Sequence, residues 1–474
     1  MSLSTLLILV AAALLARLLG RGRLRLPLLL ALSVLALFWL QPVTPIRRLD
    51  FWLPVAALSL AVLGWLLTAQ PAQRWTRATA FTGALLMALV LLIALTRHLH
   101  LEGILTPSRP PRTGTVLTVL AALALAGLAL ARWQKIGAGW LWLMTVALIG
   151  LLAALKSPPL AAALSGWLRA LADQDVSLAS AGDLRWLGFS YLAFRLIHTL
   201  RDRQAGRLPD ASLAEYLVYM VFFPAVSAGP IDRLERFFKD LRAAPVPSGE
   251  DLLAAAPRLA LGSLRKFVIA DTLGLVALSA ANAPQLRSTG WAWVTLYAYA
   301  FQIFFDFAGY TDIAIGAGRL LGIQLPENFN QPYRRANLTL FWNNWHMTLT
   351  QWFRAYFFNP FTRALRRAKQ PLSAGAAILL TQVSTMLLIG LWHGITWNFV
   401  LWGLWHGLGL FVQNRYADWV RPRLSWLEAR PRLGQAVGVL NVLMTFHFVA
   451  LGWVWFALPT VPLSLGVFKV LFGI

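Results

Sequence analysis

Long apolar runs, each close to the length that a bilayer requires, constrain this chain more than any other feature. A membrane-spanning helix needs about 20 mostly apolar residues, because its backbone N–H and C=O groups must bond within the helix. We therefore predict an all-α, polytopic integral membrane protein with about a dozen transmembrane and re-entrant helices. The clearest runs are residues 6–19, 28–40, 53–69, 81–95, 116–130, 141–155, 374–391 and 437–458.

Basic residues are concentrated between the apolar runs. The formal net charge of +23 would suggest a nucleic-acid partner for a soluble protein, but loops that face anionic lipid carry the same pattern. We expect the lipid bilayer, and not nucleic acid, as the partner of these charges. The loops with more basic residues usually face the cytoplasm, which favours an outside N-terminus here. The more basic set holds Arg17, Arg21, Arg23, Arg25, Arg74, Arg77, Arg132 and Lys135, and the alternate set holds Arg47, Arg48, Arg97, Arg109, Arg112 and Lys156.

The absence of cysteine limits the possible chemistry. With no cysteine in the chain, disulfides, thiolate metal sites and a cysteine nucleophile are excluded, and we predict no metal site. The first positive charges follow the first apolar run, so we expect that run to be a retained helix and not a cleaved signal peptide.

Chemical content divides the chain into three parts. Residues 1–155 are rich in Ala and Leu and are expected to form N-terminal transmembrane scaffold helices. Residues 183–413 interrupt their apolar runs with Gly, Pro, Asn, Trp, His and charged residues, which lipid tolerates only where protein or a cavity surrounds the backbone. Within this expected catalytic core, residues 328–369 are too polar to span and too aromatic for a free loop, so we predict re-entrant or interfacial helices. Residues 414–474 are expected to be C-terminal transmembrane helices.

Four histidines lie in or beside apolar segments of the C-terminal half: His346, His393, His406 and His447. A buried ionisable group in a membrane is costly and is a functional candidate, although a neutral imidazole in a packed core is the alternative for each one. His393 lies in the sequence GLWHG, where two glycines allow close approach of another chain or a ligand. Trp392 and Trp397 could supply rigid walls, as in a narrow tunnel.

His346 follows two amides and an indole, Asn343, Asn344 and Trp345, that offer hydrogen bonds and stacking. Together with its neighbours it forms part of a series of motifs. Residues 309–316 (GYTDIAIG), 325–333 (LPENFNQPY), 341–346 (FWNNWH) and 391–394 (LWHG) resemble, in order and spacing, the membrane-bound O-acyltransferase (MBOAT) family. Residues 222–224 (FFP) and 227–233 (SAGPIDR) look like its bacterial branch of alginate O-acetylases and teichoic-acid D-alanyltransferases. The resemblance covers roughly residues 187–413 and implies helices around a central tunnel.

The resemblance also implies an activity. His393 matches the catalytic histidine of the family, and His346 matches the second active-site histidine of the bacterial branch. Family members pass an acyl group from a thioester, acyl-CoA or an acyl carrier protein, to a hydroxyl. In the polysaccharide-modifying branch the donor is cytoplasmic and the glycan acceptor lies outside, and some relatives need a periplasmic partner. We therefore expect a multi-pass enzyme of the bacterial plasma membrane.

The residues suit this chemistry. A neutral imidazole, with an ordinary pKa of about 6.5, can take the proton of an attacking hydroxyl and contribute about 10²–10⁴ in rate. We assign this base to His393, and we assign substrate orientation or oxyanion stabilisation to His346 with Asn343 or Asn344. Trp345 and Trp392 are candidate substrate-binding residues. Asp312, like Asp306, could orient a histidine or form a structural ion pair, for example with Arg319.

Basic residues around the predicted re-entrant segment are candidates for donor docking. Arg334, Arg335 and Arg354 could bind CoA phosphates or an acidic carrier protein, with lipid headgroups as an equal alternative. Many bacterial relatives have a basic pair at Asn343 and Asn344 and an acidic residue at Ala355, so the identity of the donor stays open. Asn328 and Asn330 are expected to satisfy exposed backbone near the re-entrant turn. His406 and His447 are expected to pack in the core.

Several functions remain open at this point. We expect transfer of an acyl group, acetyl first, to an extracytoplasmic polysaccharide or cell-wall glycopolymer. The alternative within the class is transfer of D-alanine from a carrier protein to a teichoic-acid-like polymer. A glycan transporter or flippase would need charged residues along a midplane path in two related halves, whereas the motifs here lie in one half. A non-catalytic membrane scaffold is the last alternative.

Overall fold

The computed structural model describes residues 2–20, 22–99, 101, 103, 105–133, 137–243, 249–370, 372–420, 423 and 430–474, and these contain helices and no strands. Their packing forms two units, Met1–Leu259 with Ile313–Pro326, and Ala260–Asp312 with Glu327–Ile474. These two packing units are not the three parts expected from the chemical content of the sequence. The three-part division stays a prediction.

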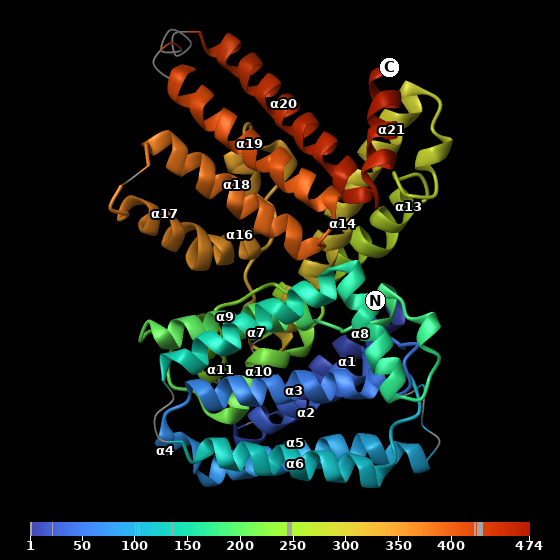
Figure 1. Ribbon diagram of the computed structural model, residues 1–474, viewed down its shortest axis with the longest axis vertical. Coiled ribbons are helices and arrows are strands. Elements are labelled where there is room, and N and C mark those ends of the chain that lie inside the picture. The colour runs from blue at the N-terminus through green and yellow to red at the C-terminus, as the bar shows by residue number, and fades with distance from the viewer. Residues whose placement is uncertain are drawn as a thin grey trace. The chain divides into compact units, whose positions relative to one another are not determined.

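The N-terminal helices of the first unit follow the predicted apolar runs (Figure 1). Ser2 caps the first helix, where its side chain accepts a hydrogen bond from the N–H of Thr5. The helix at residues 49–68 is mostly buried. The helices at residues 113–131 and 138–156 instead expose large apolar side chains such as Leu125 and Val146, which fits contact with lipid. The helices are α1 (Leu3–Leu19), α2 (Arg25–Trp39), α3 (Leu49–Thr68), α5 (Arg77–Leu95), α6 (Thr113–Ala131) and α7 (Ala138–Lys156).

The upstream FFP motif at residues 222–224 lies in the remaining part of the first unit. Phe222 and Phe223 of the FFP sequence are almost fully buried, and the buried Arg195 donates to the backbone carbonyls of Tyr219 and Met220. This part of the resemblance therefore lies in a packed core. Helix α11 is amphipathic and buries Phe237 and Phe238. The helices are α8 (Pro158–Leu171), α9 (Phe189–Gln204), α10 (Leu213–Val221) and α11 (Leu234–Arg242), and α12 (Gly249–Ser263) and α14 (Thr289–Leu320) each contribute to both units.

The second unit holds the FWNNWH and LWHG motifs, while the GYTDIAIG and LPENFNQPY motifs are divided between the two units. The predicted re-entrant segment is a series of short helices, of which α15 and α16 have seven residues each, or about 10 Å of rise. Neither can cross a bilayer alone, and their depth in the membrane stays a prediction. The segment contains α15 (Leu338–Asn344), α16 (Met347–Phe353), the π-helix η9 (Arg354–Phe358) and α17 (Asn359–Arg366).

Two long helices of the second unit, α18 (Ala374–His393) and α19 (Trp397–Val420), lie side by side and bring His393 into place (Figure 1). Glycines allow this approach, because a Cβ atom on Gly403 would lie 2.8 Å from the Cα of Leu387. The third long helix, α20 (Pro431–Ala457), packs on α19 and is followed by α21 (Val461–Phe472).

Seven helices among the described residues are long and apolar enough to cross a membrane by length and composition. They include α2, α3, α5, α6, α7, α18 and α20, while α1, the α10 region and α21 are apolar but shorter. The predicted all-α, polytopic membrane architecture is confirmed.

Candidate active site

His393 is the last residue of α18, and its half-buried imidazole is surrounded by aromatic rings. The ring centroid lies 4.5 Å from that of Trp392, 4.7 Å from Phe456 and 5.9 Å from Trp402. Trp397, expected from the sequence to form a wall, is instead 75% exposed at the start of α19. Trp402 and Phe456 supply walls that the sequence did not single out, because they come from helices that close on His393 only in the fold.

The glycines on either side of His393 admit another element, as expected, and that element is α19. A Cβ atom on Gly390 would lie 2.4 Å from the backbone oxygen of Phe399, and one on Gly394 would lie 2.7 Å from the Phe399 ring. Real Cβ atoms do not approach other atoms this closely, so both positions require glycine. Close packing between α18 and α19 thus fixes the direction of the imidazole.

His346 has an unusual backbone. It precedes α16 with φ 42° and ψ 54°, a left-handed conformation that costs a side chain such as histidine about 1–3 kcal/mol. Asn328 binds the two residues that follow His346. The N–H of Met347 donates to the backbone oxygen of Asn328 at 2.9 Å, and the hydroxyl and N–H of Thr348 donate to its Oδ1 at 2.6 and 3.3 Å. Asn328 therefore satisfies backbone at this turn.

The side chain of His346 is almost completely buried, at 4% exposure. Its ring centroid lies 4.7 Å from that of Phe307 and 6.3 Å from that of Trp392. Neither ring nitrogen has a hydrogen-bond partner among the described residues, and a buried polar atom in that state calls for an explanation. Because the indole of Trp392 also lies against His393, the fold brings the two predicted catalytic histidines to one aromatic ring from 47 residues apart.

The two asparagines of the FWNNWH motif bind arginines. The Oδ1 of Asn343 accepts from Arg354 at 2.6 Å, and the Oδ1 of Asn344 accepts from Arg335 at 3.1 Å. Asn344 also donates to the carbonyl of Leu340 at 2.7 Å. The residues predicted to help His346 therefore hold two of the arginines predicted to dock the donor.

The other predicted residues have structural contacts. Arg334 is exposed, with its guanidinium 3.4 Å from the Oε1 of Gln331. Trp345 is 5% exposed in an aromatic cluster, with its ring 5.5 Å from that of Phe341. Asp312 pairs with Arg265, and so takes the structural role that the sequence left open, with a different arginine from the one suggested.

Three further ionisable groups have structural contacts, and one of them, His447, is half-buried with its Nε2 2.8 Å from the hydroxyl of Tyr297. Asp306 forms an ion pair with Lys266, which lies in the π-helix η6 (Leu264–Ala270). His406 is fully buried, as expected, with its ring 5.0 Å from that of Trp342 and 4.9 Å from that of Trp402. No group of three or more His, Asp or Glu side chains could hold a metal ion in the part of the chain that is described.

Comparison with known proteins connects this geometry to a family. The sequence profile of the membrane-bound O-acyltransferase family, MBOAT, matches residues 125–453. The chain belongs to the MBOAT family. The matched residues include both histidines and, apart from Phe456, the aromatic residues described around them, and the predicted family is confirmed. MBOAT relatives are acyltransferases, so the chain is an enzyme of that class in a membrane.

Curated relatives of this MBOAT chain modify different polymers. It is 33% identical to a teichoic acid D-alanyltransferase of Streptococcus thermophilus over 58% of this chain and 68% of that protein. It is 32% identical to a probable alginate O-acetylase of Pseudomonas aeruginosa over 60% of this chain and 51% of that protein. A peptidoglycan O-acetyltransferase of Helicobacter pylori is 33% identical over 55% of this chain and 47% of the relative. The chain spans about half the length of the two O-acetyl-transferring relatives.

Proposed function

We propose that this protein transfers an acyl group, with acetyl as the expected group, from a cytoplasmic thioester to hydroxyls of an extracytoplasmic polysaccharide or cell-wall glycopolymer. The observation that supports this most is the pair of histidines on one indole, one half-buried and one fully enclosed, in a chain of the MBOAT family. The proposed location is the bacterial plasma membrane. A transporter is disfavoured because the family consists of acyltransferases.

His393 acts as the general base in this proposal. Its half-buried ring can meet a hydroxyl of the acceptor, take the proton and leave the oxygen to attack the thioester carbonyl. The carbon–sulfur bond then breaks, the acyl group remains on the acceptor oxygen as an ester, and the thiol leaves with a proton. The surrounding rings of Trp392, Trp402 and Phe456 keep the reaction poor in water, which suppresses hydrolysis.

His346 stabilises the oxyanion that develops on the thioester carbonyl. One of its ring nitrogens carries a proton in the neutral imidazole, and neither has a partner in the described protein, so a donor is present without competition from a neighbouring side chain. The strained turn at His346 is a cost that such a role explains, because strain of this kind concentrates at functional sites.

The thioester donor is acyl-CoA or an acyl carrier protein. Arg335 and Arg354 dock its phosphates or acidic side chains, and Asn344 and Asn343 set the directions of the two guanidinium groups. Arg334 adds a third, exposed charge. A periplasmic partner acyltransferase could complete transfer to the polymer.

A second candidate is transfer of D-alanine to a teichoic-acid-like polymer from a carrier protein. The alignment with the Streptococcus thermophilus D-alanyltransferase covers 68% of that protein, against 51% for the Pseudomonas aeruginosa alginate relative. The same histidines would serve, since both reactions move an acyl group from sulfur to oxygen.

The test compares His393→Ala with His98→Gln, which changes an exposed histidine in the 3-10 helix η2 (Thr96–His98) after α5. Cells that produce each protein are treated with mild base, and the released acids are identified by mass spectrometry while membrane protein is followed by immunoblot. We expect His393→Ala to abolish ester release at an unchanged protein level and His98→Gln to have no effect. Released acetate supports the first candidate and released D-alanine the second. Unchanged ester content in His393→Ala would refute both.

A further inference from the structure

A pocket in the first unit lies far along the sequence from the histidines. It has a volume of about 340 Å³, near the lower end for small-ligand sites. Its lining combines apolar side chains with three charged residues at what we call the rim, two of them consecutive arginines. The lining residues are Ile46, Arg47, Arg48, Leu49, Trp52, Leu168, Leu171, Ala172 and Asp173.

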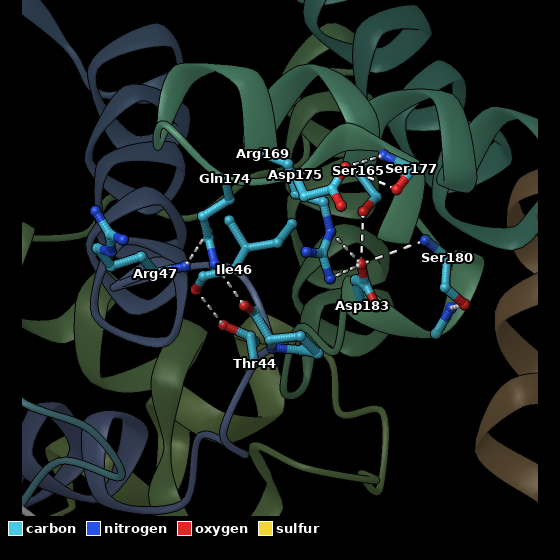
Figure 2. Close-up of polar contacts among 12 residues, drawn as sticks. Thr44, Ile46, Arg47, Ser165, Arg169, Gln174, Asp175, Ser177, Ser180 and Asp183 are labelled. Atoms are coloured by element: carbon cyan, nitrogen blue, oxygen red, sulfur yellow. Dashed lines mark hydrogen bonds and ion pairs between the residues drawn. The ribbon is translucent and has the colours of Figure 1, made fainter.

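The pocket is built by two segments that Gln174 joins (Figure 2). The Oε1 of Gln174 accepts from the N–H of Arg47 at 2.7 Å, and its Nε2 donates to the carbonyl of Pro45 at 3.1 Å. Arg48 and Asp173, on opposite segments, both have left-handed backbone, with φ 63° and 50°. The rim therefore has a fixed shape and is not a free loop.

A buried polar cluster supports the second segment. The Oδ2 of Asp183 accepts from Ser165 at 2.7 Å, from Arg169 at 3.0 Å and from the N–H of Ser180 at 3.3 Å (Figure 2). Burial alone would raise the pKa of Asp183, but the hydrogen bonds from Ser165 and Arg169 outweigh it and hold this pKa below its ordinary value. The cluster thus anchors the turn that carries Asp173 and Gln174.

The rim charges are available to a ligand. Arg47 and Asp173 are exposed and Arg48 is half-buried, and their side chains form no hydrogen bond or ion pair within the described parts of the chain. The charge nearest to them in sequence, Arg169, is already paired with Asp183. Two guanidinium groups fit a phosphate or carboxylate, and a carboxylate beside them fits hydroxyl donors.

We propose that this pocket binds an anionic, hydroxyl-rich unit of the acceptor glycopolymer, and the proposal rests on the function proposed above. Arg47 and Arg48 bind its phosphate or carboxylate, Asp173 accepts hydrogen bonds from its hydroxyls, and Trp52 lies along its apolar face. Arg47 and Arg48 belong to the less basic set of loops, which the charge distribution places outside, where the acceptor is expected.

Binding to the full chain in nanodiscs of neutral lipid tests this directly, with calorimetry as the measurement. The probes are a short oligo(glycerol phosphate), an oligouronate and a neutral oligosaccharide of the same length. Arg48→Asn removes the charge and keeps a residue that accepts left-handed backbone, and we expect about tenfold weaker binding of the anionic probes. Asp173→Asn, which also tolerates that backbone, should bind them more tightly. Arg77→Gln, an exposed charge at the start of α5, is the matched control.

Each outcome decides between explanations. Equal affinity of Arg48→Asn and the unchanged protein for the anionic probes would overturn the proposal. An effect of Arg48→Asn that appears only in nanodiscs of phosphatidylglycerol would also overturn it, because that result would identify a lipid site. The ester content of His393→Ala cells tests the proposed function separately. If those cells lose ester but Arg48→Asn binds the anionic probes normally, only the pocket proposal is overturned. Binding of anionic probes should also weaken as salt is raised.

Discussion

Replacing Asn328 with alanine should misplace His346 without touching either histidine. The substitution removes the acceptor that binds the hydroxyl and N–H of Thr348 and the donor that lies 3.4 Å from Thr311. A hydrogen bond contributes about 0.5–1.5 kcal/mol net, so these bonds together contribute about 2 kcal/mol. That is similar to the cost of the left-handed backbone at His346, about 1–3 kcal/mol. The equilibrium between the native turn and relaxed arrangements should therefore shift roughly thirtyfold toward the relaxed ones.

The assay is acyl transfer by purified protein in nanodiscs, followed as thiol released from the thioester when acceptor is present. We expect Asn328→Ala to lower this rate by up to roughly thirtyfold, with the thermal unfolding of the protein only slightly changed. Asn330→Ala is the matched control, because Asn330 is exposed and its N–H, which the substitution keeps, makes the bond to Asn344. Equal rates for Asn328→Ala and the unchanged protein, or an equal loss in Asn330→Ala, would show that this clamp does not position His346.

Three more substitutions test the packing around these sites. Gly390→Ala places a Cβ atom 2.4 Å from a backbone oxygen and should abolish transfer and lower thermal stability, while Gly375→Ala on the same helix, with nothing within 4 Å, should change neither. His346→Asn should lose transfer but unfold at a higher temperature than His346→Ala, because asparagine accepts left-handed backbone; equal unfolding would contradict this. Asp183→Asn should cost about 3 kcal/mol at neutral pH by breaking a buried ion pair, whereas the exposed Asp175→Asn should cost little. Because the pKa of Asp183 is lowered in the folded protein, that cost should shrink as the pH falls below about 4, and a constant cost would refute the assignment.

The helices could be predicted from the sequence because lipid leaves the chain few choices. An apolar run such as the one in α6 must bond its own backbone, so its composition determines both its structure and its environment. The proximity of His346 and His393 could not be derived in this way. It followed from the order of the MBOAT motifs, and no property of the 46 residues between the two histidines specifies that both should contact Trp392.

The neighbours of each motif were less predictable than its chemistry. The glycines around His393 indicated a close approach, but sequence could not distinguish a substrate from Phe399 of the next helix. Asn343 and Asn344 indicated hydrogen bonding, and the fold directs both amides to Arg354 and Arg335. Such pairings depend on where short helices end and turn, and a periodic pattern carries no information about that.

The contrast in burial between the two histidines separates their proposed roles. A general base must meet a hydroxyl that arrives from water on a polymer, which a half-buried ring such as that of His393 allows. An oxyanion donor should instead be fixed before the reaction, so that no reorganisation is needed when charge develops. His346 meets that requirement through its 4% exposure and its turn held by Asn328. Exchange of the two roles would place the accessible ring where enclosure matters and the enclosed ring where access matters. The packing therefore supports the same proposed assignment as the motif.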